Sequence, residues 1–509
     1  MARESRLFQT EARAMATGGI RSLVVAGGGT AGWMVAAALA ARMAPRMPLA
    51  VTLVESEQIG VIGVGESTLP SLVRFHRAVL NLDESDFLRR VGATFKAAIR
   101  FDGWSRPGDS YFHPFGKQSD PPPIPFHHFW LHGRALEDET PYDAYSLEAA
   151  AAHAGVIEPS ELAYAYHIDA VAYAAYLRTY AEARGVRRIE GRIAGAALDG
   201  EAGTIEALVL ADGRRVEADF FIDCTGFRGV LIEQALEAGY EDWSRFLPCD
   251  RAVAVAAEQR VVPGPFTRAI ARPHGWQWRI PLQRRSGNGY VYCSALCSDD
   301  RARELLLNHL DGQPLAEPML LRFAVGRRRA HWKRNCMAIG LSAGFLEPLE
   351  ATGIFLIQQA IVEFMRLFPV DRISPAQADA CNRIMDAHFE QVRDFLMLHY
   401  HLNRRDDSPL WMDCRRRDLP DSLQRLLDLF RSCGQLRFPG GGPFSWHSWI
   451  HVMLGQKLVP ESYYPAVRAS GAEADARVLW GLARRRRTIR AAVEQMPEHA
   501  SLLSSALSS

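Results

Sequence analysis

The chain has 509 residues, of which 48% are hydrophobic and 23% charged, as is typical of a globular protein with two or three domains or one large unit. Its formal net charge is +1, so the composition lacks the basic excess that favours nucleic acid or a membrane surface. The eight cysteines include no CxxC pair, which argues against a disulfide framework and favours reduced thiols and a cytoplasmic location.

The first 19 residues, MARESRLFQTEARAMATGG, contain no apolar run of the kind found in signal peptides. We expect residues 1–19 to form a disordered lead-in. No later stretch of roughly 18 uninterrupted apolar residues predicts a membrane span.

A nucleotide-binding unit opens the ordered part of the chain. Residues 23–26 (LVVA) predict a short buried strand, and residues 27–32 (GGGTAG) predict a glycine turn. A helix is predicted over residues 33–43 and a second strand over residues 50–56. This βαβ order implies parallel strands and a doubly wound sheet.

The turn carries Gly27, Gly29 and Gly32 in GxGxxG spacing. Such a turn lets backbone N–H groups approach a pyrophosphate at a helix N-terminus. Glu55, at the end of the second strand, is placed to accept hydrogen bonds from a ribose diol. The motif alone does not distinguish FAD from NAD.

Two later segments favour FAD. FFIDCTG at residues 220–226 resembles the second fingerprint of flavoprotein hydroxylases, and IGLSAGF at residues 339–345 resembles the segment that passes the ribityl chain of FAD in that superfamily. We therefore predict an α/β fold with a doubly wound, flavin monooxygenase-like FAD-binding module over residues 20–368. A helix from about residue 352 ends this module, and a mostly helical region over residues 369–509 is predicted to complete the substrate pocket.

Residues 92–104, GATFKAAIRFDGW, alternate as a half-buried strand does. A period of two places Phe95, Ile99 and Phe101 on one face and Lys96 on the other. Most lysines are exposed, so this pattern alone favours a solvated lysine, and a functional role needs support from elsewhere.

Three further patterns carry weaker signals. Residues 108–141 are rich in aromatics, histidine and proline, which predicts functional loops over the sheet, inserted within residues 100–150. The basic run at residues 484–487 predicts a solvated helix face. His399 and His401 have no carboxylate or cysteine at ligand spacing, so no metal site is expected.

Five segments together resemble the flavin-dependent tryptophan halogenase family over roughly residues 20–500. They are GGGTAGW (27–33), GVGEST (63–68), TFKAAIRF (94–101), GWQWRIP (275–281) and EPLEATGI (347–354). The WxWxIP signature in the fourth segment distinguishes halogenases from flavin monooxygenases, which share the glycine turn. The resemblance implies an enzyme that uses reduced FAD, O2 and chloride or bromide to form hypohalous acid and to halogenate an electron-rich aromatic such as indole.

The resemblance also assigns roles to residues. Lys96 matches the lysine that holds the oxidant beside the substrate, Glu350 matches its partner carboxylate, and the amides of Thr352 and Gly353 match the halide site. The implied cofactor-binding residues are Gly27, Gly29, Thr30, Ala31, Gly32, Glu55, Ser56, Ile59, Val61, Glu66, Ser67, Ile193 and Leu341. The implied substrate-pocket residues are His113, Phe115, Trp276, Trp278 and Phe444, without any metal ligand.

The sequence departs from the enzymes that take free tryptophan, which clamp the charges of the amino acid with tyrosines and an acid in the C-terminal part. Residues 431–444, RSCGQLRFPGGGPF, place Ser432, Cys433 and glycines there. A zwitterion without charged partners is penalised by desolvation. We therefore expect an indole-like substrate without an amino-acid headgroup.

Alternative functions stay open on the same scaffold. An FAD-dependent aromatic monooxygenase and a free-tryptophan halogenase share most of these motifs, whereas a non-catalytic FAD-binding protein is at odds with the intact polar groups in all five segments. The sequence shows no second nucleotide fingerprint for NADH, so we expect a separate flavin reductase to supply reduced FAD. The other expected partner is a small aromatic substrate, with no nucleic acid or membrane, and a homodimer is left open.

Overall fold

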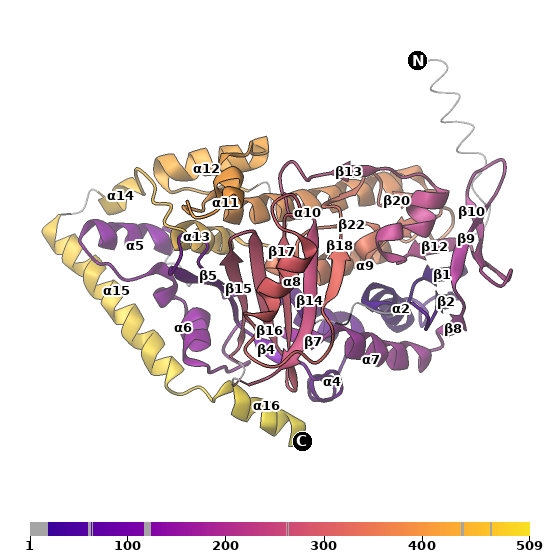
Figure 1. The fold of residues 1–509 in the computed structure, drawn as a ribbon, viewed down its shortest axis with the longest axis horizontal. Coiled ribbons are helices and arrows are strands. Elements are labelled where there is room, and N and C mark those ends of the chain that lie inside the picture. Colours follow the sequence, from indigo (N-terminus) through magenta and orange to yellow (C-terminus); the bar gives the residue numbers. More distant parts are fainter. Residues whose placement is uncertain are drawn as a thin grey trace, which may run out of the picture.

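The computed structural model describes residues 19–59, 63, 65–116, 124–260, 262, 264–438, 442–468 and 471–508 (Figure 1). The predicted lead-in, apart from residue 19, and the predicted cofactor contact Val61 lie outside the described residues. Within the described part of the chain, no helix combines the length and the apolar content that a membrane crossing needs.

A six-stranded sheet confirms the predicted doubly wound fold. Its strand order is β20-β21-β12-β1-β2-β8. The bounds are β1 Ser22–Ala26, β2 Ala50–Glu55, β8 Arg187–Glu190, β12 Phe220–Asp223, β20 Trp332–Lys333 and β21 Cys336–Ala338. All neighbours except β20 and β21 pair in parallel. Strand β1 reads SLVVA and is almost wholly buried, as expected for a parallel strand covered on both faces.

Helix α2 (Thr30–Arg42) follows the glycine turn and packs against α7 (Ala170–Glu182) and α9 (Gly353–Arg366). It begins earlier than the predicted residue 33. The cause is the tight turn, which already lets the Trp33 N–H donate to the Gly29 carbonyl at 3.1 Å. The predicted helix from about residue 352 corresponds to α9.

A second, seven-stranded sheet has the order β18-β14-β17-β16-β15-β5-β6. The bounds are β5 Ala98–Asp102, β6 Ser110–Pro114, β14 Arg251–Glu258, β15 Phe266–Arg272, β16 Gly275–Pro281, β17 Arg285–Tyr292 and β18 Met319–Arg322. Strand β5 pairs in parallel with β15, and the other neighbours pair antiparallel. Strand β16 carries the GWQWRIP segment, so the two tryptophans of the signature point to the same face of this sheet.

Smaller sheets and short helices connect these layers. The three-stranded sheets have the orders β3-β7-β4, β11-β10-β9 and β13-β19-β22. Their bounds are β3 Gly65–Ser67, β4 Thr94–Lys96, β7 Ala165–Asp169, β9 Ile193–Leu198, β10 Ile205–Leu210, β11 Arg215–Glu217, β13 Tyr240–Asp242, β19 Gly326–Arg328 and β22 Gly344–Phe345. The short helices include α3 Ser71–Phe75, η1 His76–Leu80, α4 Glu84–Val91, η2 Tyr142–Tyr145, α6 Leu147–Ala154, η3 Gly226–Arg228, η4 Val230–Ala235, α8 Asp299–Leu307, η5 Gly340–Ser342 and η6 Pro348–Glu350.

The predicted strand around Lys96 is divided between two sheets. Strand β4 joins β7, whereas β5 joins the seven-stranded sheet, and the chain crosses between them at Ala97. There the Ala97 N–H donates to the Pro265 carbonyl at 2.7 Å, and the Ala97 carbonyl accepts from the Phe115 N–H at 3.1 Å. Both faces of β4 are buried, so the alternating pattern did not mark a solvated face.

The predicted loops over residues 108–141 contain more regular structure than expected. They include β6, which pairs antiparallel with β5, and helix α5 (Phe126–Ala135). The composition did not predict β6, because its sequence, SYFHP, contains the aromatic, histidine and proline residues that are also typical of loops. Residues 117–123 lie outside the described chain.

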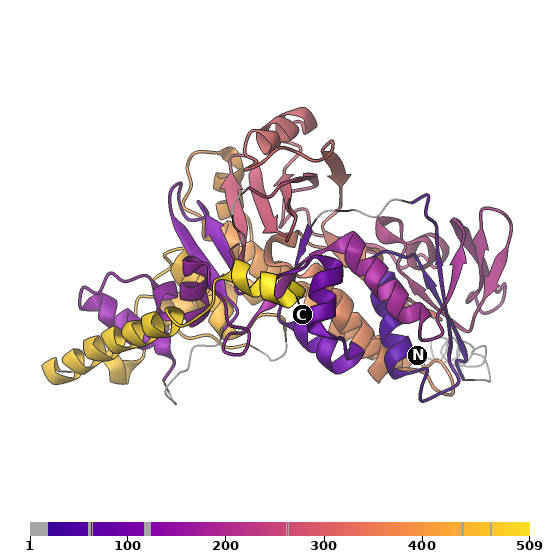
Figure 2. The ribbon, with the colours of Figure 1, turned by 90° about the horizontal axis from the view of Figure 1, so that it is seen from below.

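The C-terminal part is helical, as predicted. Its helices are α10 Pro375–His401, α11 Pro409–Arg416, α12 Asp421–Cys433, α13 Trp446–Gly455, α14 Pro465–Arg468, α15 Ala472–Val493 and α16 His499–Ser508. Helix α15, in yellow, packs along α5 and α6 at one end of the molecule (Figures 1 and 2). One hydrophobic core extends from Ile20 to Leu503, so the helical part shares its core with the sheets.

The basic run on α15 is only partly the solvated face that the sequence predicted. Arg487 is exposed. Arg486 Nη1, by contrast, lies 3.0 Å from the Asp138 carboxylate and donates to the Tyr145 hydroxyl at 2.7 Å. The Arg485 guanidinium lies 4.2 Å from the centre of the Phe126 ring. Two of the four arginines, Arg485 and Arg486, therefore bind α15 to the segment around α5 and η2.

Candidate active site

A cavity of about 580 Å³ opens where β1, β2 and β12 end. Open α/β sheets bind dinucleotides at this edge, beyond the carboxyl ends of their parallel strands. The lining includes Gly27 after β1, Glu55 at the end of β2 and Cys224 after β12. The cavity therefore lies where the βαβ motif predicted a nucleotide site.

The glycine turn fits a pyrophosphate. A Cβ at Gly32 would lie 1.9 Å from the Gly27 carbonyl oxygen, so only glycine lets the first turn of α2 approach the strand this closely. A Cβ at Gly29 would meet nothing within 4 Å, so the turn presents bare backbone to the cavity. The N-terminus of α2 adds free N–H groups and a favourable dipole for an anion.

Glu55 is held in place by two donors. Arg188 Nε donates to one of its carboxylate oxygens at 2.6 Å, and Trp33 Nε1 donates to the other at 3.3 Å. The charge-assisted hydrogen bond from Arg188 orients the carboxylate at the cavity edge. This arrangement suits the predicted hydrogen bonds to a ribose diol.

The remaining predicted cofactor residues fall into three groups. The cavity lining contains Thr30, Ala31, Ser56, Ile59, Glu66, Ser67, Ile193 and Leu341. Gly32 packs behind the turn, and Val61 is outside the described residues. The predicted set lacked several residues that also line the cavity, among them Thr225, Arg228, Phe345, Met385 and Phe389.

Lys96 is fully buried at the end of β4. Its Nζ donates to the Thr68 carbonyl at 3.0 Å and lies 4.8 Å from the centre of the Phe115 ring. Burial lowers the pKa of the Lys96 amine to about 7, and the negative charge of Glu350 opposes this shift. The side chain can therefore exchange between ammonium and amine near neutral pH. The solvated-lysine alternative is wrong.

Glu350 is fully buried at the end of η6, between two imidazoles. His113 Nδ1 donates to its two oxygens at 3.0 and 2.9 Å, and His399 Nε2 lies 2.9 Å from Oε1. Burial alone would raise the pKa of this carboxyl group. The charge and hydrogen bond of His113, with His399 beside it, outweigh burial and hold the pKa at about 2.

Lys96 and Glu350 both lie directly behind the cavity wall. Thr68, which binds the Lys96 amine, follows Ser67 of the lining. Leu349 and Ala351 line the cavity, whereas Glu350 between them turns its side chain the other way, toward His113. The wall is therefore about one residue thick where it separates the cavity from the two buried charges.

The predicted halide residues begin helix α9. Thr352 and Gly353 both line the cavity, close to Glu350 in sequence but on the opposite side of the wall. The Thr352 hydroxyl is buried without a hydrogen-bond partner among the described residues. A Cβ at Gly353 would meet nothing within 4 Å, so the helix N-terminus is open to an anion.

The predicted substrate-pocket residues do not all lie together. His113 and Phe115 flank the two buried charges, as described above. Phe444 lies 6.3 Å from the His113 ring and stacks on Phe395 at 3.9 Å.

Trp276 and Trp278 line the flavin-side cavity instead, with their rings 6.0 Å apart. Among the described residues, neither indole has a ring contact with His113, and the assignment of Trp276 and Trp278 to the substrate pocket stays a prediction.

The sequence missed two functional neighbours. His399 was considered only as a metal ligand, and its contact with Glu350 across the fold carried no local signal. Glu347, three residues before Glu350, is also fully buried and bonds to Trp276. Within the described chain, no group of three or more His, Cys, Asp or Glu side chains is placed to hold a metal ion.

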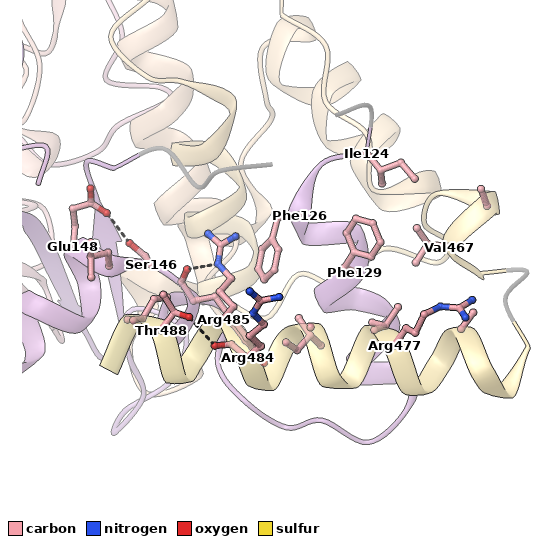
Figure 3. A pocket seen from close by; sticks show the side chains of 18 of the residues that line it. Ile124, Phe126, Phe129, Ser146, Glu148, Val467, Arg477, Arg484, Arg485 and Thr488 are labelled. Atoms are coloured by element: carbon pink, nitrogen blue, oxygen red, sulfur yellow. Dashed lines mark hydrogen bonds between the residues drawn. The ribbon is translucent and has the colours of Figure 1, made fainter. Parts of the chain in front are cut away.

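A larger cleft, of about 870 Å³, lies between α5, α6 and α15 (Figure 3). Phe126 and Phe129 face the helix that carries Arg477, Arg484 and Arg485. Its lining contains none of the residues that surround Lys96 and Glu350. Size alone therefore does not identify the site of the chemistry.

The fold and its cavity define a dinucleotide-binding α/β protein, and comparison with known proteins identifies the family. The family model described as tryptophan halogenase matches residues 22–472. The chain therefore belongs to the tryptophan halogenase family, and its class is that of the FAD-dependent halogenases.

Known structures agree over nearly the full chain. Xcc4156, a flavin-dependent halogenase from Xanthomonas campestris, is 44% identical with a TM-score of 0.92, covering 96% of this chain and 98% of that one. BrvH, from Brevundimonas sp. BAL3, is 45% identical with a TM-score of 0.91, covering 96% and 99%. Tryptophan 6-halogenase SttH from Streptomyces toxytricini is 34% identical over 485 residues, 87% of this chain and 91% of the relative. The predicted family, fold and enzyme class are confirmed.

The coupling between the two buried charges can be measured by titration. Glu350→Gln removes the negative charge that favours the ammonium form, so the pKa of Lys96 is expected to fall below about 7. The chain has only four lysines, so NMR of 13Cε-labelled lysine can follow Lys96, assigned with Lys96→Arg. The signal of exposed Lys457 is the internal control and should be the same in both proteins. A Lys96 titration that Glu350→Gln leaves unchanged would contradict the coupling.

Proposed function

We propose that this enzyme uses reduced FAD, O2 and chloride or bromide to make hypohalous acid, with which it halogenates an electron-rich aromatic such as indole. One observation carries the proposal: an amine and a carboxylate are buried together immediately behind the wall of the flavin cavity. A hydroxylating flavoenzyme needs direct access from flavin to substrate and has no use for this pair.

The cavity residues fit FAD. The glycine turn would hold the pyrophosphate, Glu55 the ribose, and the segment after β12 the central part of the cofactor. When bound, reduced FAD with O2 supplies the oxidising power that turns halide into hypohalous acid. Thr352 and Gly353 would bind the halide through the N-terminus of α9, where an unpartnered hydroxyl is also available.

Lys96 would hold hypohalous acid by hydrogen bond. As an ammonium it can protonate the oxygen that leaves when the O–X bond breaks, giving water while the ring carbon forms its bond to halogen. As an amine it can then take the proton that the ring carbon releases. A pKa of about 7 suits a group that both gives and takes a proton at neutral pH.

Glu350 would act mainly through its charge. Electrophilic substitution builds positive charge on the aromatic ring, and a fixed carboxylate in a dry site stabilises that charge. A carboxyl group with a pKa of about 2 is a weak base, so removal of the ring proton falls better to the amine.

The substrate site favours a ring without an amino-acid headgroup. Helix α13, of sequence WHSWIHVMLG, carries no aspartate, glutamate, lysine or arginine. Ser432 and Cys433, in the predicted clamp region, both donate to the Leu429 carbonyl of their own helix. These residues therefore supply no carboxylate, lysine or arginine to pair with the charges of a zwitterion.

Three further expectations belong to this proposal. A separate flavin reductase would supply reduced FAD in the cytoplasm, and the enzyme could work as a monomer or a homodimer. Residues 20–368 would form the FAD module, and residues 369–509 would cover the substrate site. The two parts share one hydrophobic core.

Loss of either buried charge is expected to remove halogenation while FAD binding persists. Lys96→Ala should give no halogenated indole, and Glu350→Gln should lower kcat by about two to four orders of magnitude, because a charge-stabilising group is lost. The assay supplies FAD, a reductase, NADH, O2 and bromide, with products identified by mass and FAD affinity measured separately. Full activity of Lys96→Ala would exclude this mechanism, and a hydroxylated product from the unmodified enzyme would favour the monooxygenase.

Free tryptophan is expected to be a poorer substrate than indole. Burying two charges without partners should lower kcat/KM by about ten-fold or more. Tryptamine and indole-3-propionate, each with one of the two charges, show which charge is rejected. A kcat/KM for free tryptophan clearly above that for indole would show that a charge clamp exists.

A further inference from the structure

Glu347 occupies the start of the segment that ends in Glu350, but its side chain faces a different part of the interior. It is fully buried. Its Oε2 accepts from Trp276 Nε1 at 2.8 Å and from the Tyr400 hydroxyl at 2.6 Å. One oxygen of this carboxyl group thus connects strand β16 to helix α10.

The other oxygen of Glu347, Oε1, is buried with no hydrogen-bond partner among the described residues. The described contacts of this carboxyl group include no ion pair, and both donors, an indole and a phenol, are neutral. An ionised carboxylate in such surroundings would lose its hydration without a compensating charge. Glu350 shows the contrast, because two imidazoles flank it. Burial raises the pKa of Glu347 to about 7, which also favours the protonated form of this carboxyl group.

The indole of Trp276 is held by packing and by one directional contact. Its ring is buried in the core, tilted against Trp278 at 6.0 Å and against Trp104 at 6.3 Å, and the hydrogen bond from Nε1 is its directional contact. The indole N–H is a single donor, and Glu347 is its acceptor. Trp276 lines the flavin cavity, so its orientation sets the shape of the wall.

Tyr400 braces Glu347 from the other side. Its ring stacks on Trp411 at 5.6 Å, and its hydroxyl lies 3.7 Å from Cys249 Sγ. Packing within the core therefore fixes the Tyr400 hydroxyl. The hydroxyl in turn holds the Glu347 carboxyl group that accepts from Trp276.

We propose that Glu347 keeps its proton up to near-neutral pH and is a positioning residue: it fixes the Trp276 indole in the wall of the flavin cavity. Two carboxyl groups three residues apart then have opposite states. Glu347 is neutral and shapes the wall, whereas Glu350 is ionised and serves the substrate side. The proposal extends the proposed function but does not need it, because the charge state and the indole orientation can be observed in the resting protein.

The first test compares Glu347→Gln with Glu347→Ala. Glutamine keeps an uncharged acceptor of the same length, so near-ultraviolet circular dichroism from Trp276 should stay as in the unmodified protein. Alanine removes the acceptor, so the near-ultraviolet spectrum of Glu347→Ala should show much of the change that Trp276→Phe causes. The infrared band of a protonated carboxyl group, recorded at about pH 6, below the pKa of about 7, should lose one component in Glu347→Gln. Glu66→Gln is the control that removes a separate carboxyl group, one that lines the cavity and whose pKa is also raised to about 7 by desolvation.

The second test measures how much halogenated product forms for each NADH consumed, which is called coupling below. Glu347→Ala should form about ten-fold less halogenated product per NADH, as expected when one positioning hydrogen bond is lost, while Glu347→Gln stays within about two-fold. The KM for indole should not change, because Glu347 is on the wall and not in the substrate site. In the Trp276→Phe background, Glu347→Ala should have no further effect on coupling.

Three results would overturn the proposal. The first is a carboxyl band that Glu347→Gln leaves unchanged, which would mean that Glu347 is ionised. The second is a Glu347→Gln protein as uncoupled as Glu347→Ala, which would mean that the charge is required. The third is a full additional loss in the Trp276→Phe background, which would mean that the effect bypasses Trp276. Failure of halogenation with every substrate would instead count against the proposed function, and the two spectroscopic results would still stand.

Discussion

Two opposite charges buried in the protein interior are the constraint on which the site depends. A carboxylate such as Glu350 is unstable in a protein interior unless hydrogen-bond donors and positive charge replace its hydration. Here the imidazoles of His113 and His399 lie against its oxygens, and they come from strand β6 and helix α10, far apart in the chain. Lys96, at the end of β4, is buried with its amine against the Thr68 carbonyl and supplies the opposite charge. The two sheets and the helical part must therefore come together before either charge can be held.

One short segment connects the two sides of the wall. Residues 347–353 lead from just after β22 to the start of α9. Glu347 and Glu350 point into the interior, whereas the other five residues line the flavin cavity. Glu350 faces the substrate side, while its neighbours Leu349 and Ala351 face the cavity. Ala351 has a φ of 58°, the left-handed region, which shows how sharply the chain turns there. This turn lets a halide site at Thr352 and a charge-stabilising acid share a wall one residue thick.

The sequence predicted local features better than long-range ones. The glycine turn, Glu55 and the first βαβ unit were all visible because their signals are contiguous, and the fold prediction is confirmed. The break at Ala97 was not visible, because both halves of the segment keep an alternating pattern although they belong to different sheets.

The candidate site was less accessible to residue patterns. Periodicity alone favoured a solvated Lys96, and only the family resemblance singled it out for a role. The contacts of His399 and Glu347 depend on packing between strands and helices that no local pattern records. The basic run on α15 shows the same limit, since Arg486 finds its acid more than three hundred residues earlier.

The most direct test of the account is a crystal structure of the enzyme with indole bound. The central claim is that the aromatic ring lies behind the cavity wall, beside Lys96 and Glu350. We predict the ring against His113, with a ring carbon in contact with the space between Lys96 Nζ and the Glu350 carboxylate, and with Trp276 separating it from the flavin cavity. A ring seated in the flavin cavity itself, or only in the cleft beside α15, would contradict the account.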